Sequence, residues 1–327
     1  MATNGNANTF GGLPVARLND IANPNATWLD NARAPGPQPL PAADKAAWSL
    51  RIPPYRAAET FPEHFARFVA TVDTTQVSAL IIGCWGESSE SSKVVVDELV
   101  AHAERLPALR HLFFGDIWSE ENEISWIQQS NVTPLLRVFP RLETLIIKGG
   151  SMLVLEPVEH AALRRLEFQS GGLPDDVVRA VGASVFPALE SLEMWLGVEE
   201  YGGDATIDDL GGILDGRGLP ALTTLGLMNS EIQDEIAAAV AAAPIVSRLR
   251  TLDLSMGTLG DEGAEALLAG QPLTHLEQLV VSHHYMTERM CDRLAEALPG
   301  IVLGLEDVEE EDEGDEDEVW RYVEVSE

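Results

Sequence analysis

The chain has 327 residues, 45% of them apolar, so it can bury a substantial core. Its 53 acidic and 21 basic residues give a formal net charge of −32. Such a surface repels phosphate groups, which argues against binding to nucleic acid or to an anionic membrane.

The sequence also predicts the cellular compartment of the protein. Two cysteines cannot build a disulfide framework, so a reducing compartment is favoured. The first 30 residues lack the basic and apolar regions of a secretion signal, and no apolar stretch approaches membrane-spanning length. We therefore expect a cytoplasmic protein that binds neither membrane nor nucleic acid and whose partner, a protein, carries basic groups.

The N-terminal part of the chain predicts a cap on a repeat array. Residues 1–9 are small and polar and are expected to be disordered, and the prolines of residues 31–45 favour an extended segment. Residues 48–52 alternate as in a strand, and the sequence Thr-Phe-Pro-Glu from Thr60 is typical of a capping box at a helix start. A repeat array otherwise exposes its core at its end, so we assign residues 10–75 to an N-terminal cap.

One apolar skeleton then recurs along the chain, with two residues between its first pair of apolar positions and one between its second pair. This alternation marks a short strand that turns one face to a core. Successive copies lie 21 to 33 residues apart. The copies begin at Val77, Leu109, Leu142, Leu163, Leu189, Leu222, Leu249 and Leu276, and a ninth begins at Leu298.

After each strand the pattern changes to a helical spacing, for example in residues 94–100 and 232–240. Strand-plus-helix units of this length resemble the ribonuclease-inhibitor-like leucine-rich-repeat proteins. The likeness is greatest at residues 249–268, where Leu-Gly-Asp-Glu-Gly-Ala is the usual start of the helix. The Gly-Leu-Pro-Val, Trp-Gly-Glu and final Arg-Tyr-Val-Glu-Val-Ser-Glu segments also resemble a family of bacterial cytoplasmic leucine-rich-repeat proteins without an assigned activity.

The resemblance implies an α/β solenoid, a horseshoe or arc of about eight or nine irregular repeats. A parallel sheet would line its concave face and helices its convex face. Residues 76–305 form the solenoid in this assignment, residues 306–318 an acidic linker and residues 319–327 a C-terminal strand.

The chain departs from the family pattern at the turn after each strand. The consensus has Asn or Cys three residues after the last apolar strand position, where the side chain bonds the backbone of the turn. We expect these turns to be satisfied differently here, which makes the solenoid irregular. The position is occupied by Gly150, Gly171, Ser230, Gly257 and His284.

Residues between and beside the apolar strand positions point to the concave face. The first rungs of this ladder are apolar and the later ones are acidic, with tryptophans at the loop side. The candidate partner-binding residues are Trp85, Phe113, Asp116, Trp118, Ile146, Lys148, Glu167, Glu193, Trp195, Asp253 and His284.

Two interpretations of the apolar rungs Ile81, Phe113 and Ile146 stay open. They can form an interface patch rimmed by tryptophans, since aromatic residues dominate binding hot spots, while the acidic rungs select a basic segment of the partner. Alternatively, the cap or the C-terminal tail covers them, because exposed apolar patches are uncommon without cause.

The run from Glu306 to Glu318 holds eleven of the negative charges, which leaves −21 for the rest of the chain. It cannot bury itself, so it is a solvated linker or a tail that binds a basic partner or mimics a nucleic-acid backbone. A calcium loop is excluded, because Trp320 stands where the closing Glu belongs. Residues 319–325 alternate and predict a strand that docks on the body.

The sequence predicts no catalytic residue, metal or cofactor. It contains no glycine-rich phosphate loop and no Gly-x-Ser-x-Gly, and the adjacent His283 and His284 would point in opposite directions on a strand. The leading hypothesis is a non-catalytic protein-interaction module. The alternatives are an accessory or inhibitory subunit that holds its acidic surface against a basic enzyme site, and an enzyme using Cys84, His283 or the acidic rungs.

Overall fold

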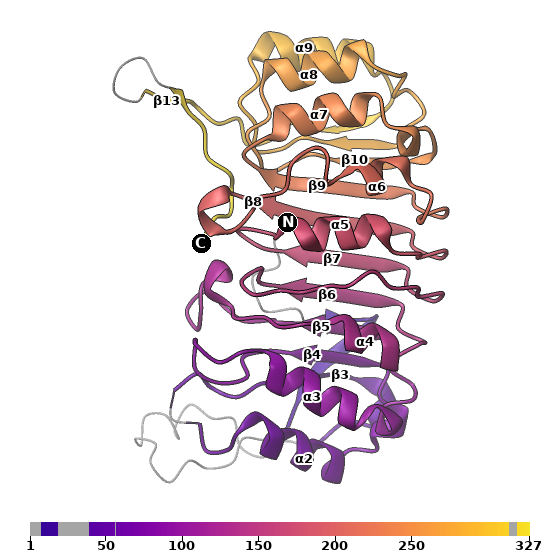
Figure 1. Ribbon diagram of the computed structural model, residues 1–327, viewed down its shortest axis with the longest axis vertical. Coiled ribbons are helices and arrows are strands. Elements are labelled where there is room, and N and C mark those ends of the chain that lie inside the picture. The colour runs from indigo at the N-terminus through magenta and orange to yellow at the C-terminus, as the bar shows by residue number, and fades with distance from the viewer. Residues whose placement is uncertain (1–7, 19–38, 56, 314–318) are drawn as a thin grey trace. The chain divides into compact units, whose positions relative to one another are not determined.

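In the computed structural model the chain forms two compact units, Met1–Val154 and Leu155–Glu327. In each unit, strands alternate with helices along the chain, and strands that follow one another in sequence lie side by side (Figure 1). The predicted α/β repeat architecture is therefore confirmed. The structure describes residues 8–18, 39–55, 57–313 and 319–327.

The sheet of the first unit begins with an antiparallel hairpin and continues as parallel strands. The strand expected at residues 48–52 is β3. Thr9, expected to be disordered, lies in β1, and residues 1–7 fall outside the described part of the chain. The strands are β1 (Thr9–Phe10), β2 (Leu13–Arg17), β3 (Ala47–Leu50), β4 (Ala79–Ile82), β5 (His111–Phe114) and β6 (Thr144–Lys148).

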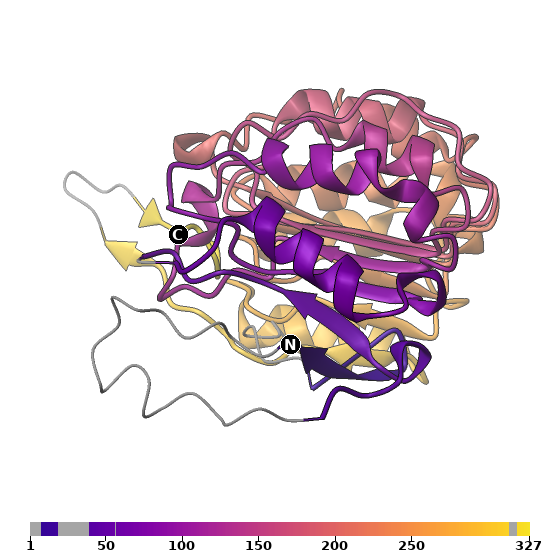
Figure 2. The ribbon, with the colours of Figure 1, turned by 90° about the horizontal axis from the view of Figure 1, so that it is seen from below.

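The repeated leucines set the register of this sheet. Leu80 pairs with Leu112, and Leu112 pairs with Leu145, so equivalent positions of successive repeats lie next to each other. All three side chains are fully buried, on the face that the helices cover. Figure 2 shows α2 and α3 on one side of these strands and the β1–β2 hairpin away from those helices.

The helix predicted after Thr60 is present and is capped as expected. Thr60 Oγ1 accepts a hydrogen bond from the Glu63 backbone N–H at 3.4 Å, and the Glu63 carboxylate accepts one from the Thr60 N–H at 2.8 Å. The helix places Phe68 against Trp48, with ring centroids 5.6 Å apart. The helices of this unit are α2 (Phe61–Thr71), α3 (Lys93–Ala101) and α4 (Thr133–Val138), with 3-10 turns η1 (Ala43–Lys45), η2 (Thr74–Gln76), η3 (Ala103–Arg105) and η4 (Ile124–Trp126).

The second unit repeats the plan with parallel strands throughout its sheet. Figure 1 shows α5 and α7 in front of these strands. The predicted ninth copy forms β12, in which Leu303 pairs with Leu279. The strands are β7 (Arg165–Gln169), β8 (Ser191–Gly197), β9 (Thr224–Ser230), β10 (Thr251–Asp253), β11 (Gln278–Val280) and β12 (Val302–Gly304). The helices are α5 (Asp175–Ala183), α6 (Gly211–Asp215), α7 (Gln233–Ala241), α8 (Asp261–Ala269) and α9 (Glu288–Ala297), with η5 (Glu199–Tyr201) and η6 (Pro244–Arg248).

Other side chains replace the missing asparagines of the turns, as expected. Gln129 Nε2 donates to the carbonyl oxygen of Lys148 at 2.8 Å, and Gln233 Nε2 donates to that of Leu227 at 2.8 Å. His284 Nε2 bonds the carbonyl oxygen of Leu305 at 3.3 Å. Gln129 and Gln233 thus bond these carbonyl groups from outside the consensus position, whereas His284 does so from the position itself.

The C-terminal segment docks on the second unit, but little of it is a strand. β14 (Val319–Trp320) pairs antiparallel with β13 (Asp312–Glu313). Beyond it, residues 321–327 run as irregular chain along the edge where β9 and β10 end (Figure 1). The alternation of residues 319–325 therefore predicted the docking correctly and the extent of the strand wrongly.

The capping box yields a stability prediction. Thr60→Ala removes the side-chain acceptor of α2 and is expected to lower the free energy of unfolding of the first unit by about 1 kcal/mol. Urea unfolding followed by circular dichroism measures this change. Thr60→Ser, which keeps the hydroxyl group, is the matched control, and an equal loss in both variants would show that the cap contributes nothing.

Candidate interaction surface

The apolar rungs of the first unit are covered within that unit. Ile81, Phe113 and Ile146 belong to one buried cluster, and the β1–β2 hairpin packs onto it through Phe10. The Phe10 ring lies 6.3 Å from the ring of Phe113. At most 9% of any of these three rungs is exposed. Phe113 and Ile146 therefore offer no open contact patch, and the cover is the N-terminal hairpin.

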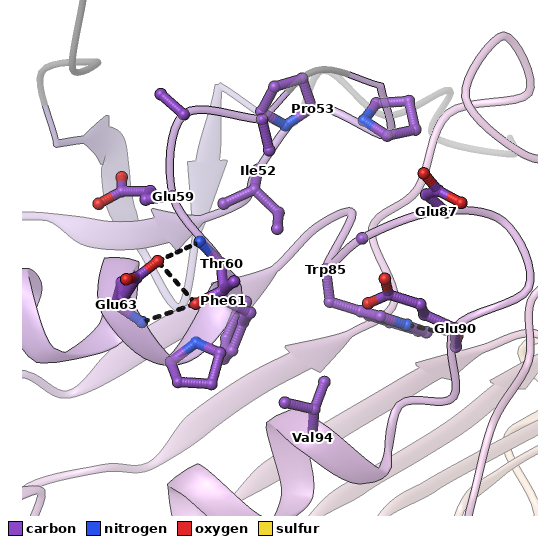
Figure 3. Close-up of a pocket in the computed structure, with 15 residues that line it drawn as sticks. Ile52, Pro53, Glu59, Thr60, Phe61, Glu63, Trp85, Glu87, Glu90 and Val94 are labelled. Atoms are coloured by element: carbon purple, nitrogen blue, oxygen red, sulfur yellow. Dashed lines mark hydrogen bonds between the residues drawn. The ribbon is translucent and has the colours of Figure 1, made fainter. Parts of the chain in front are cut away.

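Trp85 is a core residue of the first unit and does not stand on a rim. It is 3% exposed, its ring stacks on Phe114 with centroids 5.8 Å apart, and its Nε1–H donates to the Glu90 carbonyl oxygen at 2.9 Å. One edge lines a pocket of about 600 Å³, whose apolar wall also includes Ile52 and Val94 (Figure 3). Trp85 thus wedges the loop after β4 onto the core.

Four glutamates surround this pocket, but two of them serve the local fold. Figure 3 shows Glu59 and Glu63 at the start of α2, and Glu87 and Glu90 on the facing loop. Glu59 pairs with His64 and Arg67, and Glu63 caps the helix. Since these two carboxylates are already engaged, the pocket adds no separate recognition site to the surfaces below.

Asp116, Trp118 and Lys148 come together at the carboxyl ends of the strands in the first unit. The Arg51 guanidinium lies over the Trp118 ring, 3.8 Å from its centroid, and forms an ion pair with Glu121. Lys148 Nζ donates to a backbone carbonyl oxygen at 2.8 Å. A cation–π contact of this kind fixes the tryptophan ring from within the chain.

Burial decides the charge states of this group. It raises the pKa of the Asp116 carboxyl group and lowers the pKa of the Lys148 ammonium group. Both shifts favour neutral forms, because a charge is less well solvated when buried. The neighbouring charges act against these shifts, since Arg51 and Lys148 stabilise the Asp116 carboxylate and Asp116 stabilises the Lys148 ammonium group.

In the second unit the acidic rungs form one row. Glu167 on β7 pairs in register with Glu193 on β8, Glu193 with Gly226 on β9, and Gly226 with Asp253 on β10. Their sequence neighbours on the strands are the buried leucines that face the helices, so the row lies on the opposite face of the sheet. We call Glu167, Glu193 and Asp253 the acidic row.

The acidic row is only partly compensated. Arg165 Nη2 lies 2.7 Å from a Glu167 oxygen and 3.3 Å from a Glu193 oxygen. Asp253 instead accepts hydrogen bonds from Ser255, from its hydroxyl at 2.6 Å and its N–H at 3.0 Å. Burial raises the pKa of both Glu193 and Asp253. The ionised forms are therefore held at a cost that a further cation would relieve.

An apolar border lies beside the acidic row. Trp195 is on the same strand face as Glu193, two residues further along β8, and it pairs in register with Met228 on β9. They are 7% and 9% exposed. Trp195, predicted as a contact residue, is therefore nearly as closed to a partner as Phe113 and Ile146 are in the first unit.

His284 does not belong to a partner-binding surface. It is fully buried, its Nδ1 accepts a hydrogen bond from the Met286 N–H at 3.1 Å, and its Nε2 faces the Leu305 carbonyl oxygen. This pattern requires a neutral ring with the proton on Nε2, and burial lowers its pKa accordingly. The prediction of a contact residue was wrong here, because the histidine takes over the bonding role of the turn asparagine.

Sequence reasoning missed Arg165. Its position precedes the central rung by two residues, so strand alternation places it on the same face as Glu167. The alternation of side chains along β7 is therefore the sequence signal that could have identified Arg165. Gln169, two residues after Glu167, donates to that carboxylate at 2.5 Å and completes the group.

Within the described ranges, no group of three or more His, Cys, Asp or Glu side chains is placed to hold a metal ion. In the same part of the chain, no helix has the length and apolar character needed to cross a membrane. Neither finding supplies a cofactor or an anchor.

The comparisons with known proteins agree with the repeat architecture. A family profile described as "Leucine Rich repeat" matches residues 248–268. A structure of a protein from Bacteroides fragilis is 32% identical, with 77% of this chain and 71% of that chain covered and a TM-score of 0.72. An internalin from Listeria monocytogenes is 14% identical, with 70% of this chain and 72% of that chain covered, and the TM-score is only 0.27. No curated protein matches.

The covered rungs yield a prediction. Phe10→Ala removes the ring that seals Phe113 and is expected to lower the free energy of unfolding of the first unit by about 2 kcal/mol, less than for a fully buried ring. It should also raise the binding of a hydrophobic dye to the native protein. Urea unfolding and dye fluorescence measure the two effects. Phe10→Leu, which keeps an apolar cover, is the control; unchanged stability and dye binding in Phe10→Ala would contradict the covering role.

Proposed function

The chain belongs to the leucine-rich-repeat proteins, and we propose that it is a non-catalytic module that binds a protein partner through the acidic row of its second unit. Stacked repeats of this family create extended surfaces for partners. The observation that carries the proposal is the set of half-buried, incompletely compensated carboxylates on the sheet face away from the helices.

The chemistry of the row selects a basic partner segment. Among the described residues, Arg165 pairs with Glu193 and Glu167, whereas Asp253 accepts its hydrogen bonds from Ser255. A Lys or Arg side chain of the partner that reaches this sheet face between Glu193 and Asp253, which flank Gly226 in register, would pair with both carboxylates. Complementary charge gives register and specificity.

A non-catalytic role also fits the two thiols. Burial raises the pKa of Cys84 and of Cys291, so both stay protonated at neutral pH, and the thiolate is the reactive form. Both cysteines are free, which supports the proposed cytoplasmic setting. The same acidic row would equally serve an inhibitory subunit that blocks a basic enzyme site; in that case the captured partner is an enzyme whose activity falls on saturation.

Neutralising the row tests the proposal. Glu193→Gln/Asp253→Asn is expected to weaken binding of a synthetic peptide of alternating lysine and serine by about tenfold, because two partly buried charge pairs are lost. Isothermal titration calorimetry measures the affinity. Capture of partners from a native lysate, analysed by mass spectrometry, should lose the same proteins in this variant.

The matched control is Asp292→Asn/Glu296→Gln, which removes two exposed charges from α9 and leaves the sheet untouched. It should bind like the wild type. Equal affinity of the wild type and the Glu193/Asp253 variant, or an equal loss in the control, would show that net charge alone drives binding and would overturn the proposal.

The raised pKa values predict the pH dependence. As pH falls from about 7.5 towards about 4.5, the Glu193 and Asp253 carboxyl groups take up protons before ordinary carboxyl groups do. A basic partner needs their ionised forms, so its affinity should fall over this window, and binding should release protons. Calorimetry in two buffers of different ionisation enthalpy detects that release; proton uptake on binding would contradict it.

A further inference from the structure

The C-terminal residues 321–327, here called the tail, lie in a site built by three successive repeats of the second unit. Asn229, Met256 and His283 each stand two residues after the last apolar position of their strand, at regular intervals of 27 residues. All three have left-handed backbone conformations, with φ of 56°, 67° and 54°. Such a conformation is costly for residues other than glycine, so its recurrence marks a built feature. We call these three residues the ledge.

The ledge binds the backbone of the tail. His283 Nε2 lies 3.0 Å from the Tyr322 carbonyl oxygen, and the Met256 carbonyl oxygen accepts the Glu324 N–H at 2.8 Å. Asn229 holds Val325 from both sides: its Oδ1 accepts the N–H at 3.0 Å and its Nδ2 donates to the carbonyl oxygen at 2.6 Å. One residue of each repeat thus bonds an extended chain that crosses it.

Tyr285 adds a further grip on the tail backbone. Its hydroxyl group accepts the Tyr322 N–H at 2.8 Å and donates to the carbonyl oxygen of the same residue at 3.0 Å. Bonds to peptide groups do not depend on side-chain identity. The ledge therefore fits any extended segment whose side chains suit the two anchor positions of the tail.

The two anchors are Arg321 and Val323. Arg321 Nη1 lies 3.2 Å from Asp234 Oδ2 and 3.2 Å from the Thr258 carbonyl oxygen, and its guanidinium lies 5.5 Å from the centroid of the Tyr285 ring. Val323 is 9% exposed, whereas Tyr322 between them is 52% exposed. The site therefore recognises Arg-x-Val.

The surroundings of Arg321 are shaped for its side chain. The guanidinium group lies directly against Gly260, where a side chain would force it to shift. Asp234 is also fixed by two backbone N–H groups, those of Gly260 at 2.7 Å and Gly263 at 3.0 Å. The carboxylate is thus held in place independently of the tail.

We propose that the ledge is a docking site for an extended Arg-x-Val segment of a protein partner, and that the tail is its resident, exchangeable occupant. The tail belongs to no strand of the sheet, so its contacts can open locally. It is joined to the body through residues 306–318, and within this segment Glu311 pairs with Arg321 and Glu309 with His283. The site uses other residues than the acidic row and does not depend on the function proposed for that row.

A labelled peptide with the sequence of residues 319–327, Val-Trp-Arg-Tyr-Val-Glu-Val-Ser-Glu, tests the exchange by fluorescence anisotropy with the full chain. In the wild type the tethered tail competes with the peptide at a high effective concentration. Arg321→Ala weakens this competitor, so the variant is expected to bind the peptide about tenfold more tightly than the wild type. Val323→Ala should act in the same direction through the second anchor.

Three controls make the result specific. The peptide with alanine in place of its arginine should not bind. In the double variant Arg321→Ala/Asn229→Gly, the glycine keeps the left-handed backbone but lacks the side chain that bonds the peptide. This variant should lose the tighter peptide binding of Arg321→Ala. Arg293→Ala, which removes a charge that pairs with Glu265 on the helix side, should bind the peptide like the wild type. Unchanged thermal unfolding of each variant shows that its fold is intact.

Two results would overturn the proposal. Equal peptide affinity in the wild type and in both anchor variants would mean that the tail is a fixed part of the fold. A wild-type particle with twice the mass of one chain in light scattering, reduced to one chain by Asn229→Gly, would mean that the occupant is the tail of a second copy.

Discussion

A short parallel strand has two faces, and the helix of its own repeat can cover only one of them. In this chain the leucines of the skeleton settle the helix side completely: Leu80, Leu112 and Leu145 in one unit and Leu166, Leu192 and Leu225 in the other are fully buried. The helices do not cover the other face of the sheet. Side chains on that face must therefore be covered by another segment, be paired with polar groups, or be covered by a binding partner.

The two units meet this constraint differently. In the first unit the free face is apolar, and the β1–β2 hairpin closes it through Phe10. In the second unit the same positions are Glu167, Glu193 and Asp253, for which Arg165, Ser191 and Ser255 provide only partial compensation. An apolar face that is covered by the chain's own hairpin leaves little accessible surface for a partner. Carboxylates that are only partly compensated can still gain from pairing with a further cation. This contrast is the reason why we propose recognition by the second unit.

Local patterns predicted what local physics controls. Alternation and helical spacing gave the strands and helices, and Thr60 gave the start of α2, because each depends on neighbours in sequence. The hairpin over Phe113 was undetermined, since residues about a hundred positions apart had to be placed face to face. His284 was misjudged for a related reason: its role is fixed by the carbonyl oxygen of Leu305, which directly follows the next strand, β12. The ribonuclease-inhibitor-like subclass stays a prediction, as do the basic partner and the cytoplasmic setting.

The departures from the family's turn pattern connect these points. An asparagine inside the turn would bond the backbone of its own repeat and leave the edge of the sheet self-contained. Here Gln233 on α7 donates to the Leu227 carbonyl oxygen. Asn229, the left-handed residue directly before the turn position Ser230, donates to the Val325 carbonyl oxygen instead. In the next two repeats the Met256 carbonyl oxygen and the His283 ring also lie at this edge, where they bond Glu324 and Tyr322. The turns that depart from the family pattern thus leave groups at the strand ends of the second unit that can bond an extended chain.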